Sequence, residues 1–490
     1  MKNFSGSLMW LTLSEIVFNL AAYVVHSVAG RILGPADYGR YGIVVTLTTM
    51  IIVLVGNGIP TAMSKYLSEI FESHPEQVQS LKHRALLLQT ILIGSLALGF
   101  FLLAPVLAWM LHDPSLTPLF RLSSLIIPAF AAASFYHYYL TGLHLFKLQA
   151  IVKIIRSFAR VGFITVAAIS LGLPGAVGGY VLAPLFTFLA VLLLDLFYIQ
   201  PKLGYGKKVT PSALAFPYKK LLAYAGPLTL FLIFYELILT LDLYFVKGLL
   251  RDDHLTGLYN AAITIGRIPY YLFAALAMIL LPAISKSTAE LNFEATEKLV
   301  TKSLRLLILL LFPLITLLVS YSSQILHFFY GTRYNGAENA LMVFAIGVGF
   351  LTVFYVLAFA LNGAGQVKTP MWLSFVGCLA LIPLNLVLIP LWGIVGAALA
   401  TTITTLILMI AILVYTERHF HVHASGKTLL VSLLSTIMIA LLSRFLPSGN
   451  FTFVISGIFL FALSFGLLRL FGELHDSDLA PFKKLFTKKA

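Results

Sequence analysis

Charged residues and cysteines are both scarce in this chain. Of its 490 residues, only 11% are Asp, Glu, Lys or Arg, and Cys378 is the single cysteine. One cysteine excludes an intramolecular disulfide and a metal site built from several thiolates. A soluble domain of this length would need far more charge to cover its surface, so the composition excludes a soluble globular protein.

Apolar residues take the place of the missing charges. They make up 59% of the chain, and the mean hydropathy is +0.95. Stretches of about 20 apolar residues, each long enough to cross a bilayer as a helix, recur along the chain. We predict an all-α integral membrane protein with fourteen transmembrane helices, at 7–30, 39–60, 85–111, 119–140, 151–171, 175–198, 221–247, 257–281, 303–329, 338–361, 370–390, 394–415, 427–446 and 451–471.

The distribution of lysine and arginine predicts the orientation of these spans. Seven of the 33 lie in loops after odd-numbered spans or the adjoining span ends, whereas 25 lie at the amino end, in loops after even-numbered spans or the adjoining parts of the spans, and in the tail. Positive residues concentrate on cytoplasmic loops, which predicts a multi-pass plasma-membrane protein with both termini in the cytoplasm. The net charge of +14 is thereby assigned to membrane surfaces and not to nucleic acid. The basic tail from Phe482 to Lys489 is expected to lie on anionic headgroups.

Short motifs recur at a nearly constant distance along the chain. They define a repeat of six spans, and an even number of spans preserves the orientation of the repeat. This predicts two parallel six-helix bundles, at 1–200 and 201–420, with two further helices and the basic tail in 421–490. Such paired bundles are typical of alternating access. The matching motifs are Gly39-x-Tyr41 with Gly257-x-Tyr259 (218 apart), Leu140-Thr-Gly142 with Leu361-Asn-Gly363 (221 apart) and Gly175-x-x-Gly178 with Gly393-x-x-Gly396 (218 apart).

Three of the predicted spans carry polar side chains at helical spacing. Polar and charged residues are costly inside a bilayer and mark transport pathways by default. Arg267 is interpreted as the lone cation deep within a span, and therefore as the first candidate to bind an anion. In the structural alternative, Glu236 or Asp242 simply neutralises Arg267. The candidates are Glu15, Asn19 and Tyr23 in 7–30, Glu236 and Asp242 in 221–247, and Asn260, Thr264, Arg267 and Tyr271 in 257–281.

The remaining polar residues are assigned ordinary roles. Asp195 is predicted to lie at the membrane interface, and Asp37 and Arg40 to form a local salt bridge in a turn between the first two spans. No Gly-rich phosphate loop with a following Lys-Ser/Thr is present, so the chain is predicted to be a transporter and not an ATP-driven motor or another enzyme. Without cysteine or carboxylate partners, no metal site is expected at the alternating histidines His419, His421 and His423.

The segment Gly30-Arg-Ile-Leu-Gly-Pro-Ala-Asp-Tyr-Gly-Arg-Tyr41, together with Asp242 and Gly257-x-Tyr259, resembles a known family. It is similar to the polysaccharide-biosynthesis flippases of the multidrug/oligosaccharidyl-lipid/polysaccharide (MOP) exporter superfamily. The resemblance covers roughly residues 1–470. Fourteen spans are similar to the spore-cortex and peptidoglycan lipid flippase branches.

This resemblance implies a V-shaped pair of bundles that moves a polyprenyl-linked sugar from the inner to the outer leaflet, with a lipid-tail groove along the last two helices. The peptidoglycan branch carries arginines in spans 1, 2 and 8. Here Arg267 matches the span 8 position to within about a turn, but span 1 carries Glu15 and no interior arginine, which leaves the sugar and the prenyl carrier open.

On this reading Arg267 binds the pyrophosphate of a polyprenyl-linked glycan. The sugar would contact Asn260, Thr264, Tyr271, Asn19 and Tyr23. The coupling ion, Na+ or H+, would bind among Glu15, Glu236 and Asp242, and no other cofactor is expected. The remaining partners are the lipid bilayer and glycan-synthesis machinery.

Two other functions fit parts of the sequence. A MATE-like cation-coupled antiporter for drugs or organic cations would need an acidic cavity, and the three carboxylates outnumber Arg267. A membrane scaffold for a glycan synthase would not need charges at midplane depth. Drug susceptibility of a pump-deficient host and translocation in vitro separate these alternatives.

Overall fold

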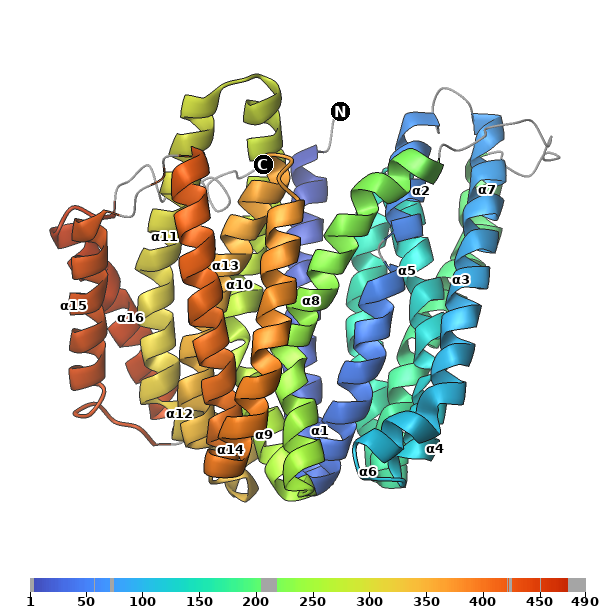
Figure 1. Cartoon of the computed structure of the whole chain (residues 1–490). Coiled ribbons are helices and arrows are strands. Elements are labelled where there is room, and N and C mark those ends of the chain that lie inside the picture. The colour runs from blue at the N-terminus through green and yellow to red at the C-terminus, as the bar shows by residue number, and fades with distance from the viewer. Residues whose placement is uncertain are drawn as a thin grey trace. The chain divides into compact units, whose positions relative to one another are not determined.

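The computed structural model describes residues 4–56, 58–70, 75–203, 218–420, 422, 425–449 and 451–474. These residues are almost entirely helical, and none of them lies in a β-strand (Figure 1). Eight of the described helices are long and apolar enough to cross a membrane. The prediction of an all-α integral membrane protein is confirmed.

Three of the spanning helices are folded in two. Each contains one glycine with a positive φ, a backbone conformation that costs other residues steric strain. These three double helices account for six of the predicted spans, and the other five spanning helices, with α15 (Gly426–Leu442), α8 (Tyr218–Leu250) and the α9–α10 pair (Asp253–Gly266, Ile268–Ala289), complete the fourteen. The folded helices are α1 (Phe4–Gly56, at Gly34), α6 (Phe146–Leu194, at Gly172) and α14 (Lys368–Phe420, at Gly393).

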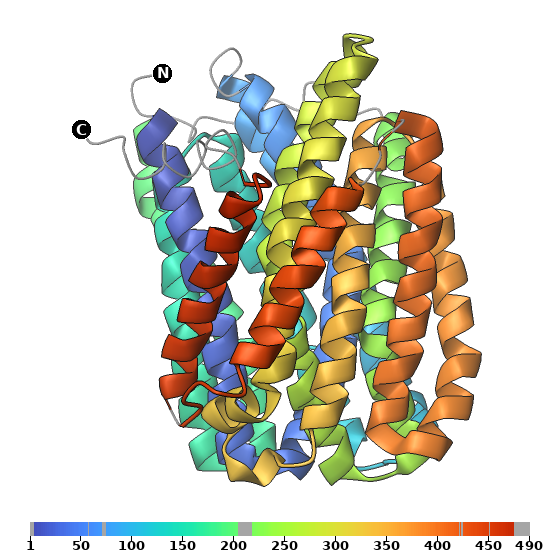
Figure 2. The same ribbon diagram turned by 90° about the vertical axis from the view of Figure 1, so that its left-hand side faces the viewer.

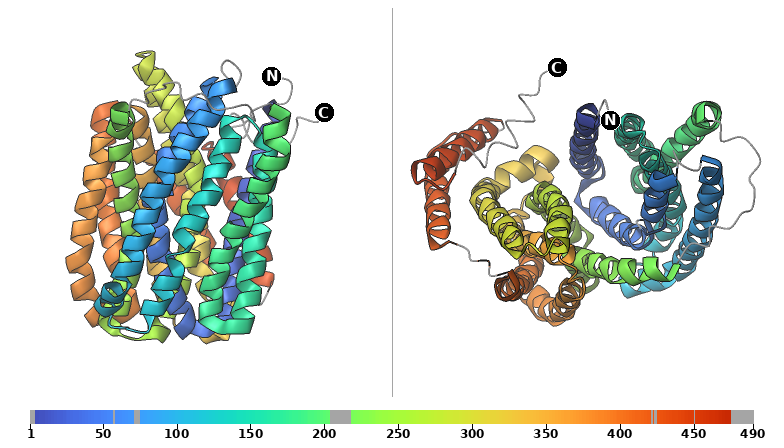
Figure 3. Two further views of the ribbon diagram at one scale, coloured as in Figure 1. Left: turned by 90° about the vertical axis from the view of Figure 1, so that its right-hand side faces the viewer. Right: turned by 90° about the horizontal axis from the view of Figure 1, so that it is seen from above.

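Glycine packing shows that the chain reverses its direction within α6. A Cβ on Gly175 would lie 1.9 Å from the carbonyl oxygen of Ala167, and a Cβ on Gly179 would lie 2.6 Å from that of Phe163. Residues progressively farther from Gly172 on one side therefore meet residues progressively farther on the other side, as in a hairpin. Figure 3 shows the two halves of α6 running beside each other.

The hairpin in α14 repeats this geometry and fixes the register of the internal repeat. Gly172 has φ 62° and ψ −138°, and Gly393 has φ 57° and ψ −135°. A Cβ on Gly396 would lie 2.0 Å from the Leu388 carbonyl oxygen, which matches the contact of Gly175. The repeat offset here is therefore 221 residues, and the predicted match of Gly175 with Gly393 is wrong. In each hairpin the glycine at the bend (Gly172 or Gly393) is followed three residues later by the glycine that packs against the other half (Gly175 or Gly396). A G-x-x-G pattern alone does not show which of its glycines lies at the bend.

The chain divides into two compact units. The first comprises Met1–Thr240 with Arg251–Gly257, and the second comprises Leu241–Leu250 with Leu258–Ala490. The predicted boundaries at 1–200, 201–420 and 421–490 stay a prediction. The first unit includes α2 (Gly58–Ile70), α3 (Pro75–Met110), α4 (Leu116–Ser123) and α5 (Ile126–Gly142), and the second includes α11 (Phe293–Ser320), α12 (Ser322–Tyr330), α13 (Glu338–Gly363) and α16 (Thr452–Leu470).

In the second unit, α15 and α16 form an antiparallel pair that packs against α11 (Figure 2). Leu309 of α11, Val431 of α15 and Leu468 of α16 share one buried cluster. The buried Glu473 carboxylate accepts a 2.7 Å hydrogen bond from the Thr428 hydroxyl. The predicted basic tail, and His421 and His423 of the predicted histidine series, lie outside the described residues.

Asp195, predicted to lie at the membrane interface, is fully buried among the helices of the first unit, and its depth in the membrane stays a prediction. It begins a short π-helical turn, Asp195–Ile199, and forms an ion pair with Lys82 of α3. The Lys82 ammonium also lies 4.3 Å from the ring centre of Tyr139 and 5.0 Å from that of Tyr136. In the sequence, Asp195 stands at the end of an apolar run. This position does not reveal that its partner is Lys82, which lies far away along the chain.

Substitution of either member of this pair tests its contribution to stability. Removing one partner strands the other as a buried charge, which costs about 3–5 kcal/mol. We therefore expect Asp195→Asn and Lys82→Met each to lower the unfolding temperature in detergent sharply. The double variant should recover much of the loss, because no unpaired charge remains. Single variants that melt like the wild type would contradict a stabilising pair.

Candidate functional site

Three cations lie on one face of α6 in the first unit. Lys153, Arg156 and Arg160 are spaced by three and four residues, which places them along a single helical stripe. The opposite face of this helix is apolar and exposed, with Ile155 and Phe158 at 43% and 68% exposure. We call Lys153, Arg156 and Arg160 the cationic cluster.

The cationic cluster extends to the middle of its helix. The first half of α6 runs from Phe146 to the break at Gly172. Arg160 is fourteen residues from its start, or about 21 Å at 1.5 Å per residue. These three cations therefore lie inside a helix of membrane-spanning length, as Arg267 is predicted to. Lys153, Arg156 and Arg160 lie in the first half of the predicted span 151–171. By sequence they are therefore counted with the adjoining cytoplasmic loop.

Aromatic rings hold the cationic cluster in place. The charged groups of Lys153 and Arg160 lie 5.0 Å and 5.3 Å from the ring centre of Phe18 on α1. Arg156 lies 4.2 Å from the ring centre of Phe130 on α5. A cation over an aromatic face gains about 0.5–2 kcal/mol and keeps its hydrogen-bond donors available for an incoming ligand.

One carboxylate accompanies the cationic cluster. Glu15 of α1 forms an ion pair with Lys153, whose side chain is 14% exposed, whereas that of Glu15 is 60% exposed. Three cations and this carboxylate leave a local charge of +2. Because an exposed carboxylate is costly in hydrocarbon, the face that bears Glu15 must be in contact with water if it lies at membrane depth.

Further polar groups surround the cationic cluster. Electrostatic interactions link Arg156 with Tyr180 and Arg160 with Tyr41. The buried Tyr41 hydroxyl and the Arg160 Nε have no hydrogen-bond partner among the described residues. Donors that are buried without partners carry a cost, which a bound anion would relieve.

The cationic cluster has no counterpart in the second half of the repeat. An offset of 221 residues places only neutral side chains at the equivalent positions of α14. The repeat therefore provides matching hairpins, but only one of them carries an anion-binding stripe. The equivalent residues are Ser374, Gly377 and Leu381.

The second unit contains a buried carboxylate instead. Asp242 of α8 is fully buried. It accepts hydrogen bonds from the Tyr259 hydroxyl at 2.6 Å, from the Thr401 hydroxyl at 2.8 Å and from the Leu243 amide at 2.7 Å. Carboxylate and hydroxyl oxygens are the ligand types that hard cations prefer.

Arg267 lies at the junction of α9 and α10, in the same unit. Its residue is only 8% exposed, and it interacts electrostatically with Asp242. This interaction fits the structural alternative, in which Asp242 neutralises Arg267. Its predicted neighbours differ in exposure, since Asn260 is 2% exposed and Tyr271 is 45% exposed. The Thr264 hydroxyl donates to the Asn260 carbonyl oxygen at 2.7 Å.

The remaining predicted residues lie in the first unit. Asn19 is exposed on α1 and its amide donates to the Glu15 carbonyl oxygen at 3.0 Å. Tyr23 is half-buried on the same helix. Glu236 is half-buried on α8, and its carbonyl oxygen accepts a 2.7 Å hydrogen bond from Thr240. The roles predicted for these residues in sugar or ion binding stay predictions.

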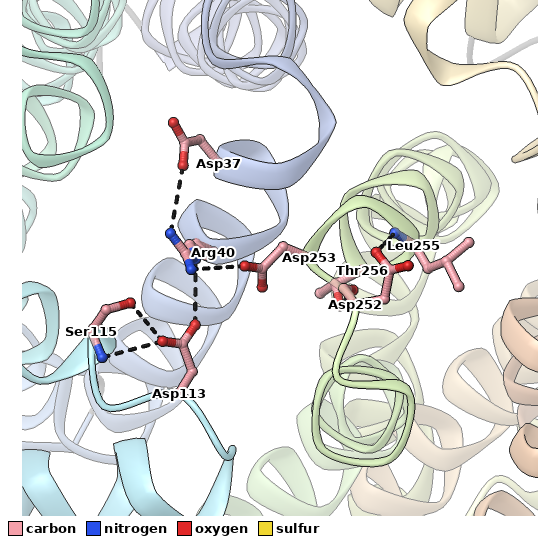
Figure 4. Close-up of polar contacts among 8 residues, drawn as sticks. All are labelled: Asp37, Arg40, Asp113, Ser115, Asp252, Asp253, Leu255 and Thr256. Atoms are coloured by element: carbon pink, nitrogen blue, oxygen red, sulfur yellow. Dashed lines mark hydrogen bonds and ion pairs between the residues drawn. The ribbon is translucent and has the colours of Figure 1, made fainter.

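A second ionic cluster in the first unit surrounds Arg40 (Figure 4). Its guanidinium lies 2.8 Å from Asp253 at the start of α9, 3.3 Å from Asp113 and 4.0 Å from Asp37. The predicted turn between the first two spans is instead helical on both sides of Gly34. The salt bridge is therefore mainly a long-range one, which spacing along the chain could not show.

Beside Arg40, the two glycines of the repeated Gly-x-Tyr motif pack against each other. A Cβ on Gly39 would lie 2.7 Å from the Gly257 nitrogen, and a Cβ on Gly257 would lie 1.8 Å from the Pro35 carbonyl oxygen. The motif thus recurs because both copies need a bare backbone at the same contact.

Comparison with known proteins agrees with this architecture. A family model described as polysaccharide biosynthesis protein matches residues 6–288, and the MatE model matches residues 227–387. An uncharacterized membrane protein of Methanocaldococcus jannaschii is 24% identical over 408 residues, which cover 81% of this chain and 94% of the relative. A sporulation protein of Bacillus subtilis is 22% identical over 344 residues (67% and 76%), and a putative O-antigen transporter of Shigella flexneri is 24% identical over 300 residues (59% and 67%).

Solved structures show the same fold. The lipid II flippase MurJ in an inward closed conformation has a TM-score of 0.71 at 17% identity, over 94% of this chain and 98% of MurJ. An inward-facing multidrug MATE transporter has a TM-score of 0.70 at 11% identity, over 85% and 98%. A MOP superfamily transporter from Pyrococcus furiosus, described as having a binding pocket of reversed polarity, has a TM-score of 0.59 at 14% identity, over 86% and 95%.

The matches to both family models, together with the fold shared with solved transporters, identify the chain as a membrane transporter of the MOP superfamily and not an enzyme. Within this superfamily, the chain belongs to the polysaccharide biosynthesis protein family, because that family's model matches more than half of its length. It is similar in sequence to a sporulation protein of Bacillus subtilis and shares its fold with the lipid II flippase MurJ.

Proposed function

We propose that the protein is an alternating-access flippase that moves a polyprenyl-diphosphate-linked oligosaccharide from the inner to the outer leaflet for cell-surface polysaccharide biosynthesis. The observation that carries this proposal is the cationic cluster. A diphosphate diester has two negative charges, and the cluster with Glu15 has a local charge of +2. The similarity to a lipid II flippase and a putative O-antigen transporter supports the same class of substrate.

In this mechanism the polyprenyl tail stays in the bilayer and only the polar head enters the protein. Arg156 and Arg160 bind the phosphates, because guanidinium groups match phosphate oxygens with two donors each. Asn19 and Tyr23 on α1 contact the sugar. In a plasma membrane that is negative inside, moving two negative charges outward gains about 4–5 kcal/mol per 100 mV. In this orientation both termini lie in the cytoplasm. The synthesis machinery would deliver the substrate from the same side of the membrane.

Asp242 is the coupling-ion candidate that the structure favours, because it is fully buried among oxygen ligands. Asp242→Asn keeps an oxygen that can accept from Tyr259 and Thr401, but it removes the charge. We expect the translocation rate of the variant to stop responding to an imposed Na+ or H+ gradient. The exposed Asp252, which accepts from the Leu255 amide at 3.0 Å, provides the control substitution Asp252→Asn. A gradient response that survives in Asp242→Asn would remove Asp242 from the coupling step.

The second candidate function is a MATE-like antiporter for organic cations. The match of the MatE model to residues 227–387 and the buried Asp242 favour it. The cationic cluster disfavours it, because three cations beside one carboxylate repel a positively charged substrate. Resistance to cationic drugs conferred on a pump-deficient host would support the antiporter.

Reconstitution in vesicles tests the proposed function. A polyprenyl-diphosphate glycan with a fluorescent sugar is placed in both leaflets, and a membrane-impermeant quencher reports how fast the inner pool becomes accessible. The protein should accelerate this exchange well above that of protein-free vesicles, and more for the diphosphate-linked than for a neutral glycolipid. Equal rates with and without the protein, for every diphosphate-linked glycan offered, would refute the proposal.

A further inference from the structure

We propose that Glu15 is an internal counter-ion that occupies Lys153 until an anionic substrate displaces it. This inference rests on the proposed function of the cationic cluster and adds a residue that controls access to it. The Glu15 carboxylate binds Lys153, one of the cations proposed to bind the substrate. It therefore competes with the substrate for this lysine.

The geometry of the pair supports displacement. Lys153 donates to a Glu15 carboxylate oxygen, and the Lys153 side chain is 14% exposed against 60% for Glu15. The cation is therefore fixed within the helix packing, held over the ring of Phe18. The carboxylate approaches from the exposed side and can leave without disturbing that packing.

The charge of the cationic cluster differs between the empty and the substrate-bound state. With Glu15 in place the cationic cluster carries +2, and with Glu15 displaced Lys153, Arg156 and Arg160 together carry +3. An empty transporter would otherwise expose three uncompensated cations at membrane depth, which is costly. Glu15 lowers that cost in the empty state and selects for ligands with enough charge to replace it.

The internal repeat retains the carboxylate of this pair but not its lysine. The residue 221 positions after Glu15 is Glu236, whereas the residue 221 positions after Lys153 is Ser374. Carboxylates thus stand at equivalent positions of both halves, whereas the position equivalent to Lys153 is a serine. The repeat therefore does not by itself require the Glu15–Lys153 pair, which depends on a lysine found in the half that carries the cationic cluster.

Binding measurements on purified protein test the proposal. The probes are farnesyl diphosphate and farnesyl monophosphate, titrated by calorimetry against the wild type, Glu15→Gln, Lys153→Gln and the double variant. Removing an internal competitor should tighten diphosphate binding by about twofold to fivefold. Because both probes have to displace the same carboxylate, Glu15→Gln should raise the affinity for both by a similar factor.

The double variant separates displacement at Lys153 from a general effect of charge. If Glu15 acts through Lys153, Glu15→Gln should change the affinity little when Lys153 is already Gln. An equal gain in both backgrounds would overturn the proposal, as would an unchanged or weaker affinity in Glu15→Gln. If neither the wild type nor Glu15→Gln binds the probes, both this inference and the phosphate role of the cationic cluster are overturned. If the wild type translocates the glycan but Glu15→Gln has the same affinity as the wild type, only this inference is overturned.

Discussion

Replacing Arg156 and Arg160 together with glutamine should reduce translocation of a diphosphate-linked glycan by about a hundredfold or more. A hydrogen bond to a charged group contributes about 1.5–3 kcal/mol, so each arginine accounts for roughly tenfold to a hundredfold in binding. Both side chains lie on the α6 stripe against Phe130 and Phe18. The vesicle exchange assay measures the rate, and calorimetry with farnesyl diphosphate measures the affinity.

The exposed Arg444, in the turn after α15, provides a matched control. Arg444→Gln makes the same chemical change outside the cationic cluster and should leave both the rate and the affinity near those of the wild type. Arg156→Lys keeps the charge but loses the two-donor geometry, so it should fall between the wild type and Arg156→Gln. A fully active double variant would return the phosphate role to Arg267, and Arg267→Ala would then be the variant that loses translocation.

Substituting alanine for Gly257 should destabilise the protein strongly, although it adds only one methyl group. A Cβ at this position would lie 1.8 Å from the Pro35 carbonyl oxygen and 2.5 Å from its carbon, both of them backbone atoms. Because no flexible side chain can move aside, the start of α9 must shift away from α1, at a cost of about 3 kcal/mol or more. The expected result is a much lower yield of monodisperse protein and a lower unfolding temperature in detergent.

Gly99 in α3 is the control for this substitution, because a Cβ there would meet no atom within 4 Å. Gly99→Ala should leave stability unchanged or raise it slightly, since alanine favours a helix interior by about 0.8–1 kcal/mol over glycine. If Gly257→Ala melted like Gly99→Ala, the close contact between Gly257 and Pro35 would be absent in the folded protein.

The sequence placed some polar residues well because membrane depth is encoded locally. An apolar run of about 20 residues has a middle, and a charge in that middle is visible by counting. Asp242 is found in this way, and the structure shows it buried. Lys153, Arg156 and Arg160 lie inside the predicted span 151–171 but in its first half, so they are counted with the adjoining loop and not as site residues.

The ion-pair partner of a charged residue, unlike its position within an apolar run, cannot be read from the local sequence. Lys82 pairs with Asp195 across 113 residues, and Lys153 pairs with Glu15 across 138. No local pattern relates such residues, and an isolated charge in the sequence gives no indication of which opposite charge neutralises it. The partner of Asp195 could not be predicted for this reason.

The sequence by itself determined the helical membrane class, the spans and the existence of a repeat. Each of these depends on hydrophobic length or on backbone requirements at glycine, and both are properties of short segments. Only the tertiary structure decided the 221-residue register, the contact between Gly39 and Gly257, and the face on which Lys153 and Arg160 meet Phe18. These depend on which helices pack together, because a side chain's partner across a helix interface is set by folding and not by its neighbours in the chain.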